Sequence, residues 1–136
     1  MKLTFHAVGK SSRSKLIRDI DKYHSLFIRA RDNNTCVQCG STKQPTCGHV
    51  IEGRHHSTRW DTHMGGNAYC QCWACNFKHG KRQQQHYITW YLGQFGQAAW
   101  EELVRRDNTA RHYMMHELRE LLVEMKRKVA EQEAGM

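Results

Sequence analysis

The chain has 136 residues, enough for one domain with a modest core, and its formal net charge of +8 favours a polyanionic partner such as nucleic acid. No run approaches the roughly 18 apolar residues of a membrane span, and the start lacks the apolar core of a signal peptide. We therefore expect a cytoplasmic protein with no membrane partner. In that reducing compartment, six cysteines indicate metal binding rather than a disulfide framework.

The first 32 residues are predicted to form an arm followed by a helix. Residues 1–11 are expected to be a flexible, basic arm. Ser12 or Ser14 could cap the helix, which the turn-forming sequence RDNNT ends near Asp32. Apolar residues recur along this helix at helical spacing, and its other face is basic. The basic face includes two residues that could extend a DNA-contacting rim, Arg29 and Arg31.

The centre, residues 33–80, contains two C-x-x-C motifs, CVQC and CWAC. Each motif places two thiolates close enough to share one ion, and two motifs complete the four-coordinate shell of a structural Zn²⁺. Four thiolates leave no open position, so this zinc is predicted to be structural and not catalytic. A redox pair is the alternative. The predicted ligands are Cys36, Cys39, Cys72 and Cys75.

The other two cysteines, Cys47 and Cys70, lie on β-like stretches. They are expected to be small buried hydrophobes on facing strands, with a role as alternative metal ligands left open.

A ββα unit is predicted around the second half of this centre. The stretches HVI and NAYCQ are β-like, and a helix is expected to begin near the second C-x-x-C motif. The hairpin would bring His49 close to Asn76.

The last part, residues 81–136, is expected to be helical. KRQQQHYITWYLGQFG and QAAWEELVRR carry apolar residues at helical spacing, and a final helix is predicted over about 109–133. Its apolar stripe suits the core or a partner helix.

The order C-x-x-C, His, Asn, C-x-x-C-Asn resembles the zinc-containing HNH nucleases. The resemblance implies that His49 is the general base, that Asn67 holds the loop that orients it, and that Asn76 binds a catalytic divalent ion.

A narrower likeness rests on SLFIRARD, CVQCG, GHVIEGRHHSTRWD, QCWACN and FKHG, with YITWYLGQFG and HELRELLVEMKRKV downstream. Over roughly residues 14–130 the chain resembles the NinG/Rap family of phage recombination endonucleases. The resemblance implies a Mg²⁺- or Mn²⁺-dependent, structure-selective endonuclease. It would hydrolyse phosphodiester bonds in branched DNA such as Holliday junctions and D-loops, in the bacterial host's cytoplasm, with phage or host recombination proteins as partners.

One position departs from the HNH pattern. Many of those enzymes have a metal-binding acidic residue just before the base, where this chain has Gly48. Water and DNA phosphate could fill the shell of a Mg²⁺ ion. Otherwise the ligand could come from Glu52, Asp61, His55 or His79.

Basic residues on either side of the centre are expected to contact phosphates, the alternative being a basic surface that serves only solubility. They are Arg54, His55, Arg59, Lys78, Lys81 and Arg82.

We therefore expect a single α+β domain over residues 1–136, in which a zinc-stabilised ββα centre, treble-clef or HNH-like, packs among several α-helices. A second copy would help to cut two strands of a junction, so a homodimer is a hypothesis, with the stripe of the last helix as one candidate interface. The alternative function is a non-catalytic zinc module that binds nucleic acid or protein, which Gly48 favours.

Overall fold

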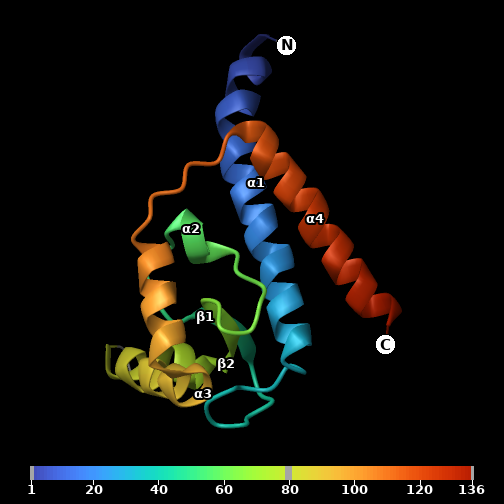
Figure 1. Ribbon diagram of the computed structural model, residues 1–136. Coiled ribbons are helices and arrows are strands. Elements are labelled where there is room, and N and C mark those ends of the chain that lie inside the picture. The colour runs from blue at the N-terminus through green and yellow to red at the C-terminus, as the bar shows by residue number, and fades with distance from the viewer. Residues whose placement is uncertain (1, 79–80, 136) are drawn as a thin grey trace. The chain divides into compact units, whose positions relative to one another are not determined.

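The structure, a computed structural model, describes residues 2–78 and 81–135, and the side chains of 13–77 and 82–135. The chain forms two compact units, Met1–Phe27 with Tyr113–Met136, and Ile28–His112, and each is described by itself. The single-domain arrangement stays a prediction. In the described ranges the elements are α1 (Lys2–Arg31), β1 (Pro45–His49), α2 (His56–Arg59), β2 (Ala68–Cys72), the π-helix η1 (Ala74–Lys78), α3 (Lys81–Asp107) and α4 (Met115–Ala134) (Figure 1).

These elements confirm the expected mixed α+β class, since the described residues contain both helices and a two-stranded antiparallel hairpin. Among the residues that the structure describes, no helix is both long and apolar enough to cross a membrane.

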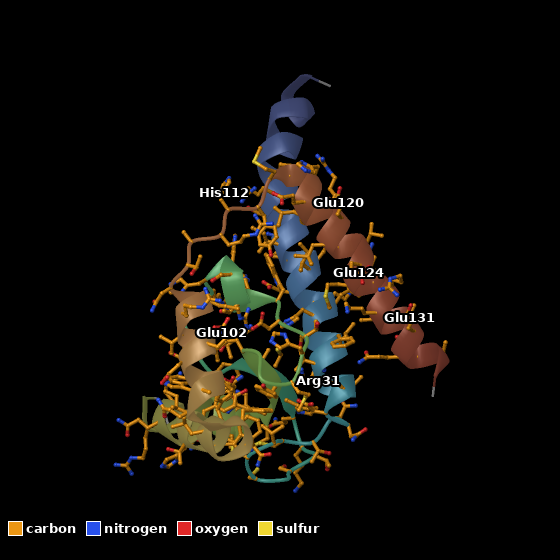
Figure 2. The ribbon with its side chains drawn as sticks, in the orientation of Figure 1. Arg31, Glu102, His112, Glu120, Glu124 and Glu131 are labelled. Carbon is orange, nitrogen blue, oxygen red and sulfur yellow. The ribbon has the colours of Figure 1, made fainter. Side chains whose placement is uncertain are left out.

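The first unit pairs α1 with α4, which lie side by side and run in the same direction (Figure 1). Arg13 donates to the carbonyl of Tyr113 at 3.1 Å, and the Gln132 amide donates to the carbonyl of Phe27 at 2.9 Å. The exposed face of α4 carries Glu120, Glu124 and Glu131 (Figure 2). Its apolar stripe buries Leu118, Met125 and Val129. A homodimer stays a prediction, and these buried side chains do not offer a surface for it.

Two helix starts differ from the expected ones. The arm predicted over residues 1–11 is wrong from residue 2 onward, because α1 already begins at Lys2. Lengthening a helix adds one hydrogen bond per residue and needs no second nucleus, so the turns before Ser12 continue the helix. The last helix begins at Met115 instead of about residue 109. The Glu117 carboxylate accepts the backbone N–H of Met114 at 2.8 Å, which caps the helix there.

The first strand of the second unit lies upstream of the predicted HVI stretch, whereas β2 covers Ala68–Cys72, one residue downstream of NAYCQ. β1 starts at Pro45 and ends at His49, so Val50 and Ile51 of HVI follow the strand. The side chain of Asn67 accepts the Ile51 amide at 2.7 Å, which replaces a ladder bond. In the register Cys47 faces Cys70, as predicted for facing strands, but only Cys70 is fully buried and Cys47 is half-buried.

An aromatic core holds α3 against this hairpin. The Tyr87 hydroxyl donates to the carbonyl of Gly48 at 2.7 Å, and the ring centroids of Tyr69 and Phe95 are 5.6 Å apart. At Gly96 the backbone φ of 88° lies in the left-handed region, which kinks α3 into two helical segments. The buried core residues are Val50, Tyr69, Tyr87, Tyr91 and Leu103.

Candidate functional site

The four predicted zinc ligands come together. The sulfur atoms of Cys36, Cys39, Cys72 and Cys75 all lie within 4.8 Å of one another, and those of Cys39 and Cys72 are 3.6 Å apart. A tetrahedral Zn²⁺ with Zn–S bonds of about 2.3 Å sets its sulfurs about 3.8 Å apart. The donor set and its spacing therefore fit a structural zinc.

The pKa of the Cys36 thiol differs from that of Cys70, which is buried outside the cluster. Burial opposes ionisation of Cys36, but backbone hydrogen bonds from the site lower the pKa of its thiol to about 7. Burial, with the charge of Asp32 as a second cause, raises the pKa of Cys70 to about 11. Burial also raises the pKa of Cys75, a member of the cluster, so the ligand assignment rests on the spacing of the four sulfur atoms and not on thiol acidity.

Three polar side chains meet beside this centre. His49 at the end of β1, Glu52 in the loop that follows, and Asn76 on η1 line the same two adjoining pockets. The prediction that the hairpin brings His49 close to Asn76 is confirmed to this extent. Glu52 is one of the four residues considered as a replacement for the missing acid, and the structure brings it to this pocket.

His49 has a defined tautomer in its neutral form. Its Nε2 lies 2.7 Å from the carbonyl oxygen of Arg59, and a carbonyl can only accept a hydrogen bond. Nε2 therefore carries the proton, and Nδ1 of the neutral ring holds the lone pair. The backbone contact also fixes the plane of the ring, which is half-buried.

Asn67 ties together the loop between the two strands. Only 1% of Asn67 is exposed, and its side-chain amide donates to the carbonyl of Ile51 at 3.1 Å and to the hydroxyl of Thr58 at 3.1 Å. Its backbone N–H donates to the Asp61 carboxylate at 2.9 Å. These bonds span the loop that contains Arg59, the partner of His49, so the geometry is that required of a loop organiser.

Asn76 is held by β1. Its side-chain amide donates to the hydroxyl of Thr46 at 2.9 Å, and that hydroxyl donates to the carbonyl of Gln71 at 2.7 Å. With its NH₂ group engaged in this way, the amide oxygen of Asn76 is the atom left to act as a metal ligand.

Asp61 and His55, also considered as metal ligands, have structural partners. Arg106 on α3 contacts the Asp61 carboxylate with both terminal nitrogens, at 2.6 and 3.1 Å. Nδ1 of His55 lies 2.8 Å from the carboxylate of Asp107, which also accepts the Thr58 hydroxyl at 2.8 Å. His55 lines a different pocket together with Asp107. The structure does not bring either residue to His49.

Arg31, which was predicted to contact DNA, has partners within the protein, and its DNA contact stays a prediction. Its side chain is only 13% exposed and donates to the Asp32 carboxylate and to the carbonyls of Thr62 and Ala68, at 2.8 to 3.0 Å. The guanidinium also lies 4.9 Å from the centre of the Tyr69 ring. Arg31 stands in the last turn of α1 (Figure 2), and its bonds to Thr62 and Ala68 link that turn to β2 and to the loop before it.

The other expected phosphate contacts have varied surroundings. Arg54 lines the pocket of His49 and is exposed, as is Arg82. Arg59 lies over the Trp60 ring at 5.4 Å, and Arg29 is half-buried. His79 and the side chains of Lys78 and Lys81 fall outside the described residues.

Sequence reasoning missed Gln71, Arg106 and Asp107. Gln71 is buried on β2 and lines the pocket of His49. Arg106 and Asp107, both on α3, contact the loop between β1 and β2, which is more than 40 positions away in the sequence. No local spacing pattern indicates such pairs.

Two C-x-x-C motifs that bracket a β-hairpin, with a histidine ending its first strand, define a small mixed α+β protein with a four-cysteine centre that could hold zinc. The family described as Bacteriophage Lambda NinG protein matches residues 3–134, so the chain belongs to the NinG family. No curated protein and no solved structure matches the chain.

Proposed function

We propose that this NinG-family chain is a metal-dependent endonuclease that hydrolyses phosphodiester bonds in branched DNA. The observation that carries the proposal is the position of His49, whose Nε2 donates to the Arg59 carbonyl while the ring lines a pocket with Glu52 and Asn76. An oriented imidazole with its lone pair on Nδ1 can act as a general base.

The reaction assigned to His49 is the activation of water. The water oxygen forms a bond to phosphorus as the bond from phosphorus to the leaving sugar oxygen breaks. The proton of the water goes to His49 Nδ1, and the leaving oxygen takes a proton from solvent. The Arg59 carbonyl accepts the Nε2–H throughout, which stabilises the imidazolium that forms.

Glu52 and the amide oxygen of Asn76 supply the hard oxygen donors that Mg²⁺ or Mn²⁺ prefers. A divalent ion held by them would stabilise the negative charge that grows on the phosphate and the leaving oxygen. Glu52 would take over the role expected of an acid at position 48, and water and phosphate would supply the remaining ligands.

The basic character of the chain supports a DNA substrate. The net charge is +8, and Arg54 lines the same pocket as His49. A phosphate in this pocket would meet the guanidinium as well as the imidazole. Homodimer formation and recombination-protein partners remain part of the proposal, as do branched substrates.

A non-catalytic zinc module is the second candidate, and one observation favours it. The space beside Gly48 is filled by the neutral amide of Gln71 rather than by an acid. In that case the pocket would bind DNA without cutting it.

One assay separates the two functions. The purified protein is incubated with a four-way junction and with a linear duplex, in Mg²⁺, in Mn²⁺ or without added divalent ion. We expect metal-dependent cleavage of the junction that falls by about 100-fold or more in His49→Ala and in Glu52→Gln. His63→Ala is the matched control, because His63 is an exposed histidine of the same loop region. Cleavage that survives His49→Ala contradicts the base assignment, and binding without cleavage supports the zinc module.

A further inference from the structure

Two neighbouring aromatic rings are exposed, and one of them, that of Phe77, lines the pocket of His49. Trp73 is 47% exposed and Phe77 is 56% exposed. Their ring centroids are 6.2 Å apart with 43° between the planes, so they form one surface. Among the described residues, the other exposed large hydrophobic side chains, Met64, Met114 and Val123, are aliphatic. This exposed pair of rings is therefore suited to bind a ligand with a flat apolar face.

The pair is fixed by the four-cysteine centre. Trp73 lies between Cys72 and Cys75, and its backbone N–H donates to the carbonyl of Gln44 at 2.9 Å. Phe77 follows on η1, two residues after Cys75. Rings attached to such a constrained backbone lose little conformational freedom when a ligand stacks on them.

The surroundings of the pair indicate what that ligand is. Phe77 and Arg54 line the same pocket as His49. An anionic backbone would suit Arg54, and a flat apolar face would suit the rings. A nucleotide offers both, but the bases of a duplex are already stacked within the helix. The rings can therefore stack only on a base that has lost its place in the duplex.

We propose that Trp73 and Phe77 form a stacking platform for an unpaired nucleobase of the DNA strand that passes His49. This site rests on the proposed function for the path of the strand. It would give the protein a preference for branch points and single-stranded stretches without any reading of base identity, because every base has a stacking face.

Binding without cleavage tests the platform. Fluorescence anisotropy, with no added Mg²⁺ or Mn²⁺, compares a forked DNA with a fully paired duplex of the same sequence. A 2-aminopurine at the first unpaired position reports stacking through quenching of its fluorescence. We expect Trp73→Ala and Phe77→Ala to weaken fork binding by roughly 5- to 150-fold, to leave duplex binding unchanged and to reduce the quenching.

Three controls make the outcome decisive. Trp73→Phe keeps an aromatic face and should keep most of the preference for the fork. Val123→Ala, an exposed apolar residue on α4, should bind both DNAs as the unchanged protein does. Zinc content and circular dichroism of each variant show that the fold is intact, and Phe77→Leu serves if Phe77→Ala does not fold.

The results also separate this inference from the proposed function. A protein that prefers the fork and quenches 2-aminopurine but never cleaves DNA keeps the platform and loses the nuclease. Cleavage together with full fork binding by both alanine variants overturns the platform. Variants that bind the fork and the duplex more weakly by the same factor also overturn the platform. So do variants that bind DNA normally but change the oligomeric state in sedimentation, because the rings would then contact protein.

Discussion

The amide oxygen of Gln71 lies 1.7 Å from the point where a Cβ on Gly48 would stand. The two residues share a face of the hairpin, because Gly48 pairs with Tyr69 and Gln71 is two positions further along β2. Gln71 is buried and its side-chain nitrogen donates to the side chain of Gln38, so it cannot simply swing away. A glycine at position 48 is thus explained by its neighbour.

This contact predicts that Gly48→Ala destabilises the protein by about 1 to 3 kcal/mol, since the new methyl group must displace the buried Gln71 amide. Denaturant unfolding measures the change. In the Gln71→Ala background the same substitution should cost much less, because the obstructing side chain is gone. Equal costs in both backgrounds would contradict the contact.

Asn67 should be required for folding as well as for any activity. Asn67→Ala removes three side-chain hydrogen bonds within the loop and leaves the Ile51 amide without its partner. We expect a loss of about 2 to 3 kcal/mol in the free energy of unfolding. Asn108→Ala, at an exposed position, is the control. A loss below about 0.5 kcal/mol would show that the loop is held by other contacts.

Removal of one zinc ligand should abolish metal binding. Cys36→Ser replaces a thiolate of the four-cysteine centre, so we expect both bound zinc and thermal stability to fall sharply. Metal analysis of the purified protein measures the zinc. Cys70→Ala is the matched control, because Cys70 is buried outside this centre and should leave the zinc content unchanged. Full zinc retention in Cys36→Ser would rule out the four-thiolate assignment.

Substitution by alanine should lower the stability of the protein at Arg31 and weaken DNA binding at Arg82. Arg31→Ala leaves the Asp32 carboxylate without its ion-pair partner in a nearly buried setting, which should cost about 3 kcal/mol of stability. Exposed Arg82 should instead serve DNA, so Arg82→Ala should keep the unfolding midpoint and lower the salt dependence of DNA binding by about one ion. Thermal unfolding and binding isotherms over a salt series measure the two effects. Normal stability of Arg31→Ala would revive a DNA role for Arg31.

The sequence by itself determined the parts whose signals are local. The C-x-x-C spacing identified all four cysteines that cluster, because two thiolates separated by two residues already share one side of a tetrahedron. Helical periodicity identified α1, α3 and α4, and the joint motif identified the NinG family. The starts of α1 and α4 were missed because capping and extension depend on single contacts, such as that between Met114 and Glu117.

The tertiary structure decided which charged and polar side chains work inside the protein and which face the pocket. His55, Asp61 and Arg31 looked available in the sequence, but each has a partner brought to it by folding. Glu52 became the candidate acid because the loop after β1 turns it into the pocket of His49. A buried charge without a partner is costly, so the side chains that fold into the protein are those that find a partner there. These partners are distant in the sequence, so no local sequence pattern predicts them.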